Sequence, residues 1–337
     1  MPWWNVWLQF LICTAAIAVC GAQISRYGDI LAEKTGMGRT WMGLVVLAAV
    51  TSLPEAATGV SAVLWVDAPD ITVGDLLGSC AFNLLILAFV DLLYPSGPAL
   101  TAADRGHLLA ASFGVVMLGV AAMGIMRPFP VALTFGHVGL STLILFFCYL
   151  AAMRSVFRYQ RRERAAYRAE HEEILVYQHI GLGIAVTKFV LNALVVVAAG
   201  SWLPRVADDV AHLMGWHQSL VGTTFVAAST SLPELVVTVG ALRLGAVDLA
   251  VGNLFGSNLF NLALLGVMDL LYFKEPILGV VAPAHAGTAV LAILMTGVAA
   301  AELVYGPEKK ALRWISWGAF FLAFIYAAYV LLLMLSG

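Results

Sequence analysis

The sequence predicts an all-α membrane protein in which ten transmembrane helices form two inverted five-helix repeats, with discontinuous helices around a central ion site. Three observations support this fold class. Of the 337 residues, 61% are hydrophobic and only 11% are charged, whereas soluble proteins carry about 25% charged residues. The chain contains ten long apolar stretches, and its two halves share the same pair of motifs.

The ten stretches are long enough to cross a bilayer, because a hydrocarbon core of about 30 Å takes roughly 20 apolar residues in a helix. The lipid bilayer is therefore an expected partner. The net charge of −2 gives no reason to expect nucleic acid. The predicted spans are 4–24, 42–64, 71–93, 106–126, 134–156, 179–200, 219–241, 248–272, 283–303 and 312–335.

The first stretch is predicted to be a retained span and not a cleaved signal peptide. It lacks a basic segment at its start, and Trp3, Trp4 and Trp7 are typical of residues at the membrane interface. The four cysteines lie in apolar segments without the spacing of a metal site, so buried reduced thiols are expected at Cys13, Cys20, Cys80 and Cys148.

The basic residues predict the orientation of the spans. If the N-terminus lies outside the cell, the inner loops hold 14 of the 18 Lys and Arg residues and the outer loops hold three, as the positive-inside rule requires. We therefore expect a multi-pass protein of the plasma membrane with both termini extracytoplasmic. Residues 158–179 are expected to form a cytoplasmic helical linker between a first repeat at 1–157 and a second at 180–337.

The internal repeat is the strongest signal in the chain. The segment TSLPE occurs at 51–55 and again at 230–234, and residues 74–94 are identical to residues 252–272 at 12 of 21 positions. Each half has five predicted spans, an odd number, so the second half enters the membrane from the opposite side. Inverted repeats of this kind place ions near the bilayer midplane, at interrupted helices where the halves meet.

Two intramembrane glutamates are the leading candidates for function. Glu55 and Glu234 end the two TSLPE segments, and neither predicted helix contains a basic residue. A carboxylate inside a membrane costs several kcal/mol and is by default a functional residue. Pro54 and Pro233 would break each helix next to the acid and free backbone carbonyl groups as ligands.

Hydroxyl and amide groups surround these acids at helical spacing. Four residues separate each Thr from its Glu, which places them on one helix face, although such hydroxyls also commonly bond to their own backbone. Asp75 and Asn253 occupy matching positions in the second motif. The candidate side chains are Glu55, Glu234, Asp75, Asn253, Thr51, Thr230, Ser52 and Ser231.

Asn83 and Asn261 are open to two interpretations, as ligands or as hydrogen-bonding residues between helices. Asp91 and Asp269 are expected at hydrated span ends, outside the site. An all-oxygen site with several carboxylates suits a hard cation, and Ca²⁺ takes six to eight such ligands. The same two or three negative charges could equally hold several Na⁺ ions or protons.

At these residues the sequence resembles the calcium:cation antiporter superfamily, the sodium/calcium exchangers and their relatives. The motifs that carry the resemblance are GLVVLAAVTSLPE with GDLLGSCAFN, and GTTFVAASTSLPE with GNLFGSNLFN. The resemblance implies secondary active antiport of Ca²⁺ against Na⁺, with no resident cofactor and no enzymatic activity. It implies that Glu55 and Glu234 share the cations, aided by carbonyl groups such as those of Ala48 and Ala227.

This chain departs from the superfamily pattern in two places. Asp75 stands where Asn is usual, and Cys80 stands where the second repeat keeps Asn258. Proton/calcium relatives typically carry Glu in a GNxxE motif, and neither repeat has it, which favours Na⁺ over H⁺ as the coupling ion. An H⁺/Ca²⁺ antiporter of the same fold stays the alternative, and potassium co-transport stays open.

Two further classes of protein are alternatives to the antiporter. A passive cation channel also uses carboxylates for selection, but broken helices in inverted repeats favour alternating access. An intramembrane aspartyl protease needs two Asp residues on facing helices, and the position that matches Asp75 is Asn253. The generically apolar lipid-facing surfaces predict no particular oligomeric state.

Overall fold

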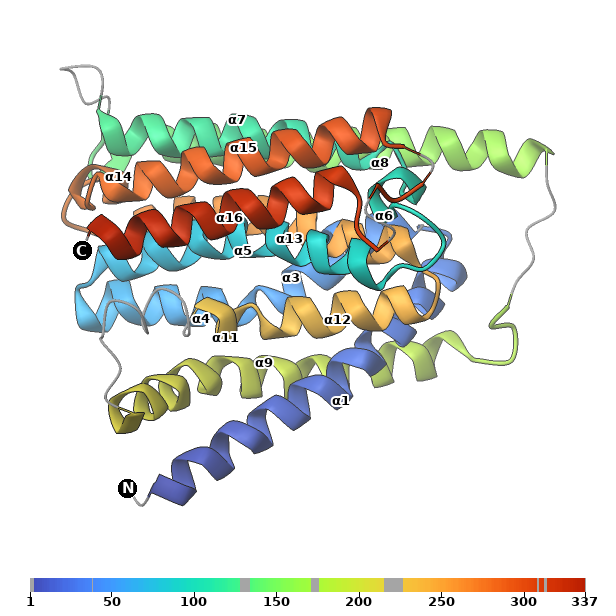
Figure 1. The fold of residues 1–337 in the computed structure, drawn as a ribbon, viewed down its shortest axis with the longest axis horizontal. Coiled ribbons are helices and arrows are strands. Elements are labelled where there is room, and N and C mark those ends of the chain that lie inside the picture. The colour runs from blue at the N-terminus through green and yellow to red at the C-terminus, as the bar shows by residue number, and fades with distance from the viewer. Residues whose placement is uncertain are drawn as a thin grey trace.

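The computed structural model describes residues 3–37, 39–127, 134–170, 176–214, 227–307, 309–311 and 314–336. These residues form a bundle of long helices with one two-stranded hairpin (Figure 1). The elements are α1 (Trp3–Thr35), α2 (Arg39–Trp41), π-helical η1 (Met42–Leu47), α3 (Ala48–Thr51), α4 (Leu53–Ser61), π-helical η2 (Ala62–Val66), α5 (Pro69–Leu93), α6 (Ala99–Ala102), α7 (His107–Met126), β1 (Thr134–Phe135), β2 (Val138–Gly139), α8 (Leu140–Glu170), α9 (Leu182–Met214), α11 (Ala227–Thr230), α12 (Leu232–Arg243), α13 (Val247–Leu271), α14 (Ile277–Val280), α15 (Ala284–Tyr305) and α16 (Trp317–Ser336).

The ten-helix inverted-repeat fold is confirmed. Eight helical stretches among the described residues are long and apolar enough to cross a membrane, including the interrupted run from Arg39 to Trp65. The apolar helix α16 and the interrupted pair α11–α12 bring the number to ten. The beginning of the span predicted at 219–241 lies outside the described residues. The start of α1 and the end of α16 lie at the same end of the bundle (Figure 1).

One predicted span boundary is wrong. The span expected at 134–156 begins instead with the short antiparallel hairpin of β1 and β2, and its helix starts at Leu140. This helix then continues without a break to Glu170, so the first part of the predicted linker extends α8. Apolar composition marked the span correctly, but it does not distinguish a strand of two residues from the first turn of a helix.

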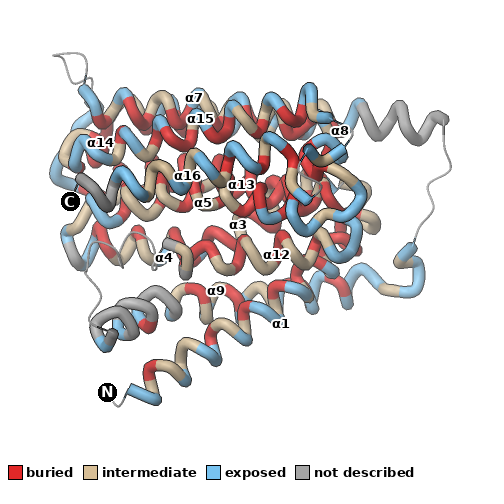
Figure 2. The backbone as a smooth tube through the Cα atoms, viewed as in Figure 1, coloured by how far each residue is buried: buried red, intermediate tan, exposed pale blue. Residues whose placement is uncertain are grey.

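Helices α5 and α13 form the centre of the bundle. Both carry buried residues around most of their circumference (Figure 2). Helix α13 packs against α5, η1 and α12, and α15 packs against α7, α5 and α16. On the opposite side, α1 packs along α9 and α12. The two central helices are those that carry the GDLLGS and GNLFGS motifs, so the second motif of each repeat lies deep in the protein.

Two His–Asp pairs join the repeats at symmetric places. Nε2 of His107, at the start of α7, lies 3.4 Å from Oδ1 of Asp248 in α13. Nε2 of His285, in α15, lies 3.0 Å from Oδ1 of Asp70 in α5. Each acid occupies the first turn of its helix, where the helix dipole favours a negative charge. The matching histidines therefore make contacts between the halves and lie outside the predicted site.

Asp91 and Asp269 also match, but the expectation of hydrated ends is wrong, because each is only 2% exposed. Asp91 accepts hydrogen bonds from the backbone N–H groups of Ala99 and Ser316, at 2.9 and 2.7 Å. Asp269 accepts one from Ile277 at 2.6 Å, among others. Backbone donors replace water around both carboxylates, which hold the connecting segments against the ends of α5 and α13.

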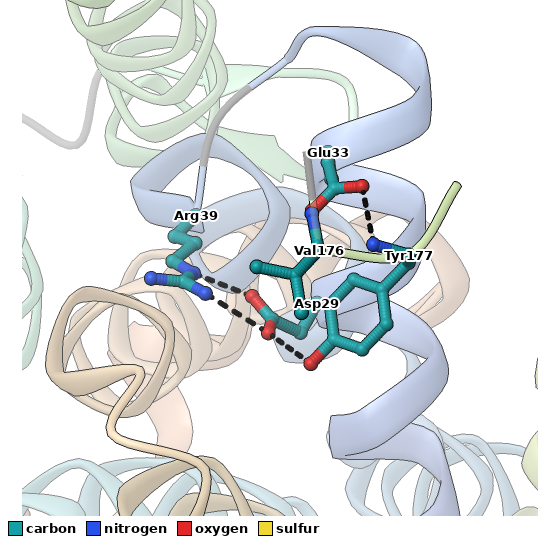
Figure 3. A network of polar contacts seen from close by, with 5 residues as sticks. All are labelled: Asp29, Glu33, Arg39, Val176 and Tyr177. Atoms are coloured by element: carbon teal, nitrogen blue, oxygen red, sulfur yellow. Dashed lines mark hydrogen bonds and ion pairs between the residues drawn. The ribbon is translucent and has the colours of Figure 1, made fainter. Parts of the chain in front are cut away.

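The far end of the linker is fixed to α1 by a polar network (Figure 3). The Arg39 guanidinium makes a two-fold contact with Asp29, at 2.5 and 3.0 Å, and the Tyr177 hydroxyl donates to Asp29 at 3.0 Å. The backbone N–H groups of Val176 and Tyr177 donate to Glu33 at 3.0 and 2.9 Å. Burial and the charge of Asp29 raise the pKa of Tyr177 above its ordinary value. The network ties the end of the linker to the first repeat.

Candidate functional site

Both TSLPE helices break at the serine. Ser52 separates α3 from α4 with φ −89° and ψ 8°, and Ser231 separates α11 from α12 with φ −83° and ψ 7°. Pro54 and Pro233 lie in the first turn of the helix that follows each break. Proline has no N–H group, so Pro54 leaves the carbonyl of Val50 without its helical donor. The discontinuities predicted from the sequence are therefore present in both repeats, in the same backbone conformation.

The two glutamates lie directly after these breaks and are fully buried, at 0% exposure each. Among the described residues, neither carboxylate forms an ion pair with a basic side chain. Oε1 of Glu234 accepts hydrogen bonds from the hydroxyls of Ser52 at 3.0 Å and Ser257 at 3.4 Å. Oε2 of Glu234 has no partner.

Glu55 differs from Glu234, since in the described part of the chain neither of its carboxylate oxygens has a hydrogen-bond partner. Its charge is also repelled by the nearby carboxylates of Glu234 and Asp75. A buried charged acceptor without a partner carries its full desolvation cost. Together with Oε2 of Glu234 and Oδ2 of Asp75, four buried carboxylate oxygens at this centre lack hydrogen-bond partners among the residues that the structure describes.

The two threonines reach across the repeat interface in the same way. Thr51 Oγ1 lies 3.3 Å from Oδ1 of Asn253, and Thr230 Oγ1 lies 3.3 Å from Oδ1 of Asp75. Thr51 is therefore next to the second motif of the other repeat, and so is Thr230. This arrangement brings together the four candidates that the sequence placed on separate helices.

The serines and the carbonyl candidates are arranged less evenly. Ser52 donates to Glu234, whereas Ser231 donates to the hydroxyl of Ser79 at 3.3 Å and not to Glu55. The Ala48 carbonyl accepts from the Thr51 hydroxyl at 3.3 Å and from the Ser52 N–H at 3.0 Å. Its counterpart Ala227 is the first residue of α11. Seven of the ten candidates therefore take part in hydrogen bonds between the repeats: Thr51, Ser52, Asp75, Thr230, Ser231, Glu234 and Asn253.

Four polar residues extend the site along α5 and α13. Ser79 and Ser257 contact the candidate hydroxyls, with Ser257 also 3.3 Å from Thr51. Asn83 and Asn261 lie one turn further along and are almost fully buried. Oδ1 of Asn83 and both amide atoms of Asn261 have no partner. All four residues follow Asp75 or Asn253 at intervals of four residues, and this helical spacing is the sequence signal for their position.

The contact between Asn258 and Cys80 explains part of this pattern. Asn258 donates from Nδ2 to the Cys80 carbonyl at 3.2 Å and accepts from Asn83 at 3.1 Å. In the matching place Cys80 offers only a thiol, 3.7 Å from the Asn258 carbonyl. A thiol cannot supply the paired donor and acceptor of an amide. Asn261, which would be the partner of an Asn at position 80, is left without a hydrogen bond.

The described residues of the centre therefore present carboxylate, hydroxyl, amide and carbonyl oxygens. Such a set fits hard cations, and bound cations would supply the partners that the carboxylate oxygens lack. Within the described part of the chain, no three His, Cys, Asp or Glu side chains converge on one point. A cation held here would thus need neutral oxygens beside one or two carboxylates.

The sequence of this chain is similar to those of known proteins. The chain matches the family model described as sodium/calcium exchanger protein over residues 5–154 and 184–335. It is 27% identical to the sodium/calcium exchanger MaX1 of Methanosarcina acetivorans over 274 residues, which cover 73% of this chain and 77% of that protein. It is 28% identical to the putative antiporter CaxA of Alkalimonas amylolytica over 264 residues, covering 77% and 78% of the two chains.

Solved structures agree on the fold. A structure of the sodium-calcium exchanger NCX_Mj, soaked with Na⁺ and Sr²⁺, superimposes with a TM-score of 0.73 and covers 96% of this chain and 97% of that chain. The identity between the two sequences is 18%. At that level the likeness concerns the arrangement of the helices.

Proposed function

This chain belongs to the sodium/calcium exchanger protein family, and we propose that it is a secondary active antiporter that exchanges Ca²⁺ for Na⁺. Transport would occur by alternating access, with the cations bound at the centre of the bundle by Glu55 and Glu234. The protein is a multi-pass membrane protein related to transporters. For this chain itself, the exchange of Ca²⁺ for Na⁺ is what we propose.

The observation that carries the proposal is the set of unpartnered carboxylate oxygens between the two broken helices. Among the described residues, Glu55, Glu234 and Asp75 have no basic partner, Glu55 and Glu234 are fully buried, and four solvent-inaccessible carboxylate oxygens of these three acids accept no hydrogen bond. Carboxylates in that condition are costly unless a cation or a proton neutralises them. A site of this kind is stable when loaded and unstable when empty.

That instability provides the coupling between the ions. A conformational change with bare carboxylates would carry them through a medium of low dielectric, which costs several kcal/mol per charge. A change with either Ca²⁺ or Na⁺ bound avoids the cost. The protein would therefore move in one direction with one ion and return with the other, and an uncoupled leak would be slow.

The ligands that we propose belong to both repeats. Glu55 and Glu234 would provide the shared charges, Asp75 and Asn253 the side oxygens of the second motifs, and the hydroxyls and carbonyls the remaining contacts. The full set is Glu55, Glu234, Asp75, Asn253, Thr51, Thr230, Ser52, Ser231, Ala48 and Ala227, to which the geometry adds Ser79, Ser257, Asn83 and Asn261.

The proposed setting is the plasma membrane, with the N- and C-termini outside the cell and residues 158–179 on the cytoplasmic side. The first repeat would comprise residues 1–157 and the second residues 180–337. Cysteine labelling from outside intact cells at the ends of the chain and in the linker tests this orientation. Labelling at the linker and not at the termini would reverse it.

Equilibrium binding tests the site itself. Purified protein in detergent should bind radioactive Ca²⁺, and Na⁺ should displace it. Glu55→Gln and Glu234→Gln should each remove this binding, while Glu302→Gln, a change at a buried acid of α15 outside the site, should keep it. Unaltered Ca²⁺ binding by both site variants would refute the proposed ligands. Displacement by protons and not by Na⁺ would favour the H⁺/Ca²⁺ alternative.

A further inference from the structure

We infer that Thr238 is a positioning residue that fixes the orientation of the Asn253 side-chain amide and so sets the affinity of the second half of the ion site. The inference rests on the proposed function, because Asn253 matters in this way only if its oxygen faces a transported cation. Thr238 lies on α12, one turn beyond Glu234, and is fully buried at 0% exposure.

Asn253 makes contacts on two sides. Its Nδ2 donates to the Thr238 hydroxyl at 3.1 Å and to the Glu234 backbone carbonyl at 3.4 Å. Its Oδ1 lies 3.3 Å from the Thr51 hydroxyl. A backbone carbonyl is only an acceptor, so the NH₂ group must face Glu234 and Thr238. The amide oxygen therefore faces Thr51 and the other site hydroxyls.

The orientation matters because the two ends of an amide are opposite in character. With the observed orientation, Asn253 presents an acceptor oxygen toward the ion site. A rotation of 180° about the last side-chain bond would present the NH₂ group there, and a donor repels a cation. The same rotation would place the amide oxygen against the Glu234 carbonyl. The Glu234 carbonyl opposes this rotation because it can only accept, and the Thr238 hydroxyl provides the shorter of the two hydrogen bonds that hold the NH₂ group in place.

The first repeat shows why no such residue is needed beside Asp75. The position that matches Thr238 is Gly59. A Cβ atom at Gly59 would lie 3.0 Å from Cε of Met268 and 3.3 Å from Cγ2 of Thr72, so there is little room for a side chain. A carboxylate has two equivalent oxygens and offers an acceptor in either orientation. Asp75 thus occurs with Gly59, and Asn253 occurs with Thr238.

Three single variants separate orientation from packing. Thr238→Val keeps the shape but removes the acceptor hydroxyl, and Thr238→Ser keeps the hydroxyl. Thr296→Val is the matched control, since the buried Thr296 hydroxyl bonds only to the Ala292 carbonyl of its own helix, at 2.7 Å. Loss of one neutral hydrogen bond corresponds to about a fivefold change in affinity. Thr238→Val should therefore raise the half-saturating Ca²⁺ concentration about fivefold, with the maximal exchange rate within about twofold of wild type.

A double variant tests whether Thr238 acts through Asn253, because a role of Thr238 in packing alone would give the same effect in either background. In the Asn253→Ala background there is no amide to orient, so Thr238→Val should leave the half-saturating Ca²⁺ concentration unaltered. The measurements are radioactive Ca²⁺ uptake into proteoliposomes and equilibrium Ca²⁺ binding to the full-length protein in detergent. Binding gives an affinity even for a variant that transports poorly.

The outcomes distinguish this inference from the proposed function. If the wild-type protein neither binds nor transports Ca²⁺, the proposed function fails. If the wild-type protein is active, the inference is overturned by a Thr238→Val variant with unchanged Ca²⁺ affinity, or by an equal effect of Thr238→Val in both backgrounds. Normal affinity in Thr238→Ser, with a fivefold loss in Thr238→Val confined to the Asn253 protein, supports it.

Discussion

The two glutamates occupy equivalent places in the repeats, yet the protein holds them differently. Oε1 of Glu234 accepts hydrogen bonds from Ser52 and Ser257, whereas the Glu55 carboxylate has no hydrogen-bond partner among the described residues. Ser231, which matches Ser52, donates to Ser79 instead. Inverted symmetry therefore fixes where the acids lie, but a single conformation gives them different partners.

This difference is what alternating access requires of an inverted repeat. The two repeats have nearly the same motif, so exchanging their conformations would exchange the partners of the acids as well. In the second state we expect Ser231 to donate to Glu55, and Glu234 to lose its contact with Ser52. The different contacts of the two acids in this structure would then be exchanged in the opposite state of the proposed transport cycle.

The largest expected effect comes from removing either charge. Glu55→Gln and Glu234→Gln should each reduce exchange at least about 100-fold, because the lost ionic interaction is worth about 3 kcal/mol. Ca²⁺-dependent uptake into proteoliposomes measures it, and a folded elution profile in detergent is the control. A variant that keeps more than a tenth of wild-type exchange would show that the two acids are not equivalent ligands.

The serines test the asymmetry more finely. Ser52→Ala removes a hydrogen bond to a charged group and should raise the half-saturating Ca²⁺ concentration about tenfold, since such bonds contribute about 1.5 kcal/mol or more. Ser231→Ala removes only a hydroxyl-to-hydroxyl contact and should raise it about threefold when this conformation is the more populated one. Equal effects of the two variants would mean that both conformations are sampled equally.

Substitution of Asp75 tests whether the charge difference between the second motifs of the two repeats affects the coupling ion. Asp75→Asn makes the two positions alike and removes one negative charge, so Ca²⁺ transport should persist while its dependence on Na⁺ changes by about threefold. Exchange is measured at fixed Ca²⁺ over a series of internal Na⁺ concentrations. Asn253→Asp is the reciprocal variant, and an unchanged Na⁺ dependence in Asp75→Asn would remove Asp75 from the site for the coupling ion.

The smallest effect is expected at Cys80. Cys80→Asn would restore the side chain that Asn258 has in the other repeat and supply partners for the Asn261 amide. Satisfying a buried amide contributes about 1 kcal/mol, so the melting temperature should rise by about 2 °C. Cys80→Ser, which is too short to reach Asn261, is the control. A lower melting temperature in Cys80→Asn would show that the cavity does not admit the amide.

The sequence predicted the parts of this protein that depend on composition and repetition. Apolar length located the helices, and the doubled TSLPE segment located both breaks, because proline has the same effect on any helix. The helical spacing of Thr51 and Glu55 predicted one shared helix face; both residues are fully buried, and Thr51 contacts Asn253 of the other repeat. The sequence also identified Asp75 and Asn253 as matching residues, and each indeed contacts a threonine of the other repeat.

The remaining features depend on contacts that no single helix encodes. Asp91 and Asp269 lie at helix ends, and only the packing of the connecting segments shows that backbone N–H groups surround them. The hairpin before α8 is too short for a periodic signal. The difference between Ser52 and Ser231 cannot be obtained from identical motifs at all, since it belongs to the conformation and not to the residues.

Ion-driven Ca²⁺ uptake tests the central claim most directly. Proteoliposomes that contain the purified protein are loaded with Na⁺, with K⁺, or with buffer that sets only a pH gradient, and radioactive Ca²⁺ is added outside. Uptake driven by the outward Na⁺ gradient, and not by K⁺ or by the pH gradient, is the predicted result. Uptake that follows the pH gradient alone would make the protein a proton/calcium exchanger, and uptake that is equal under all three conditions would contradict coupled exchange and indicate a passive pathway.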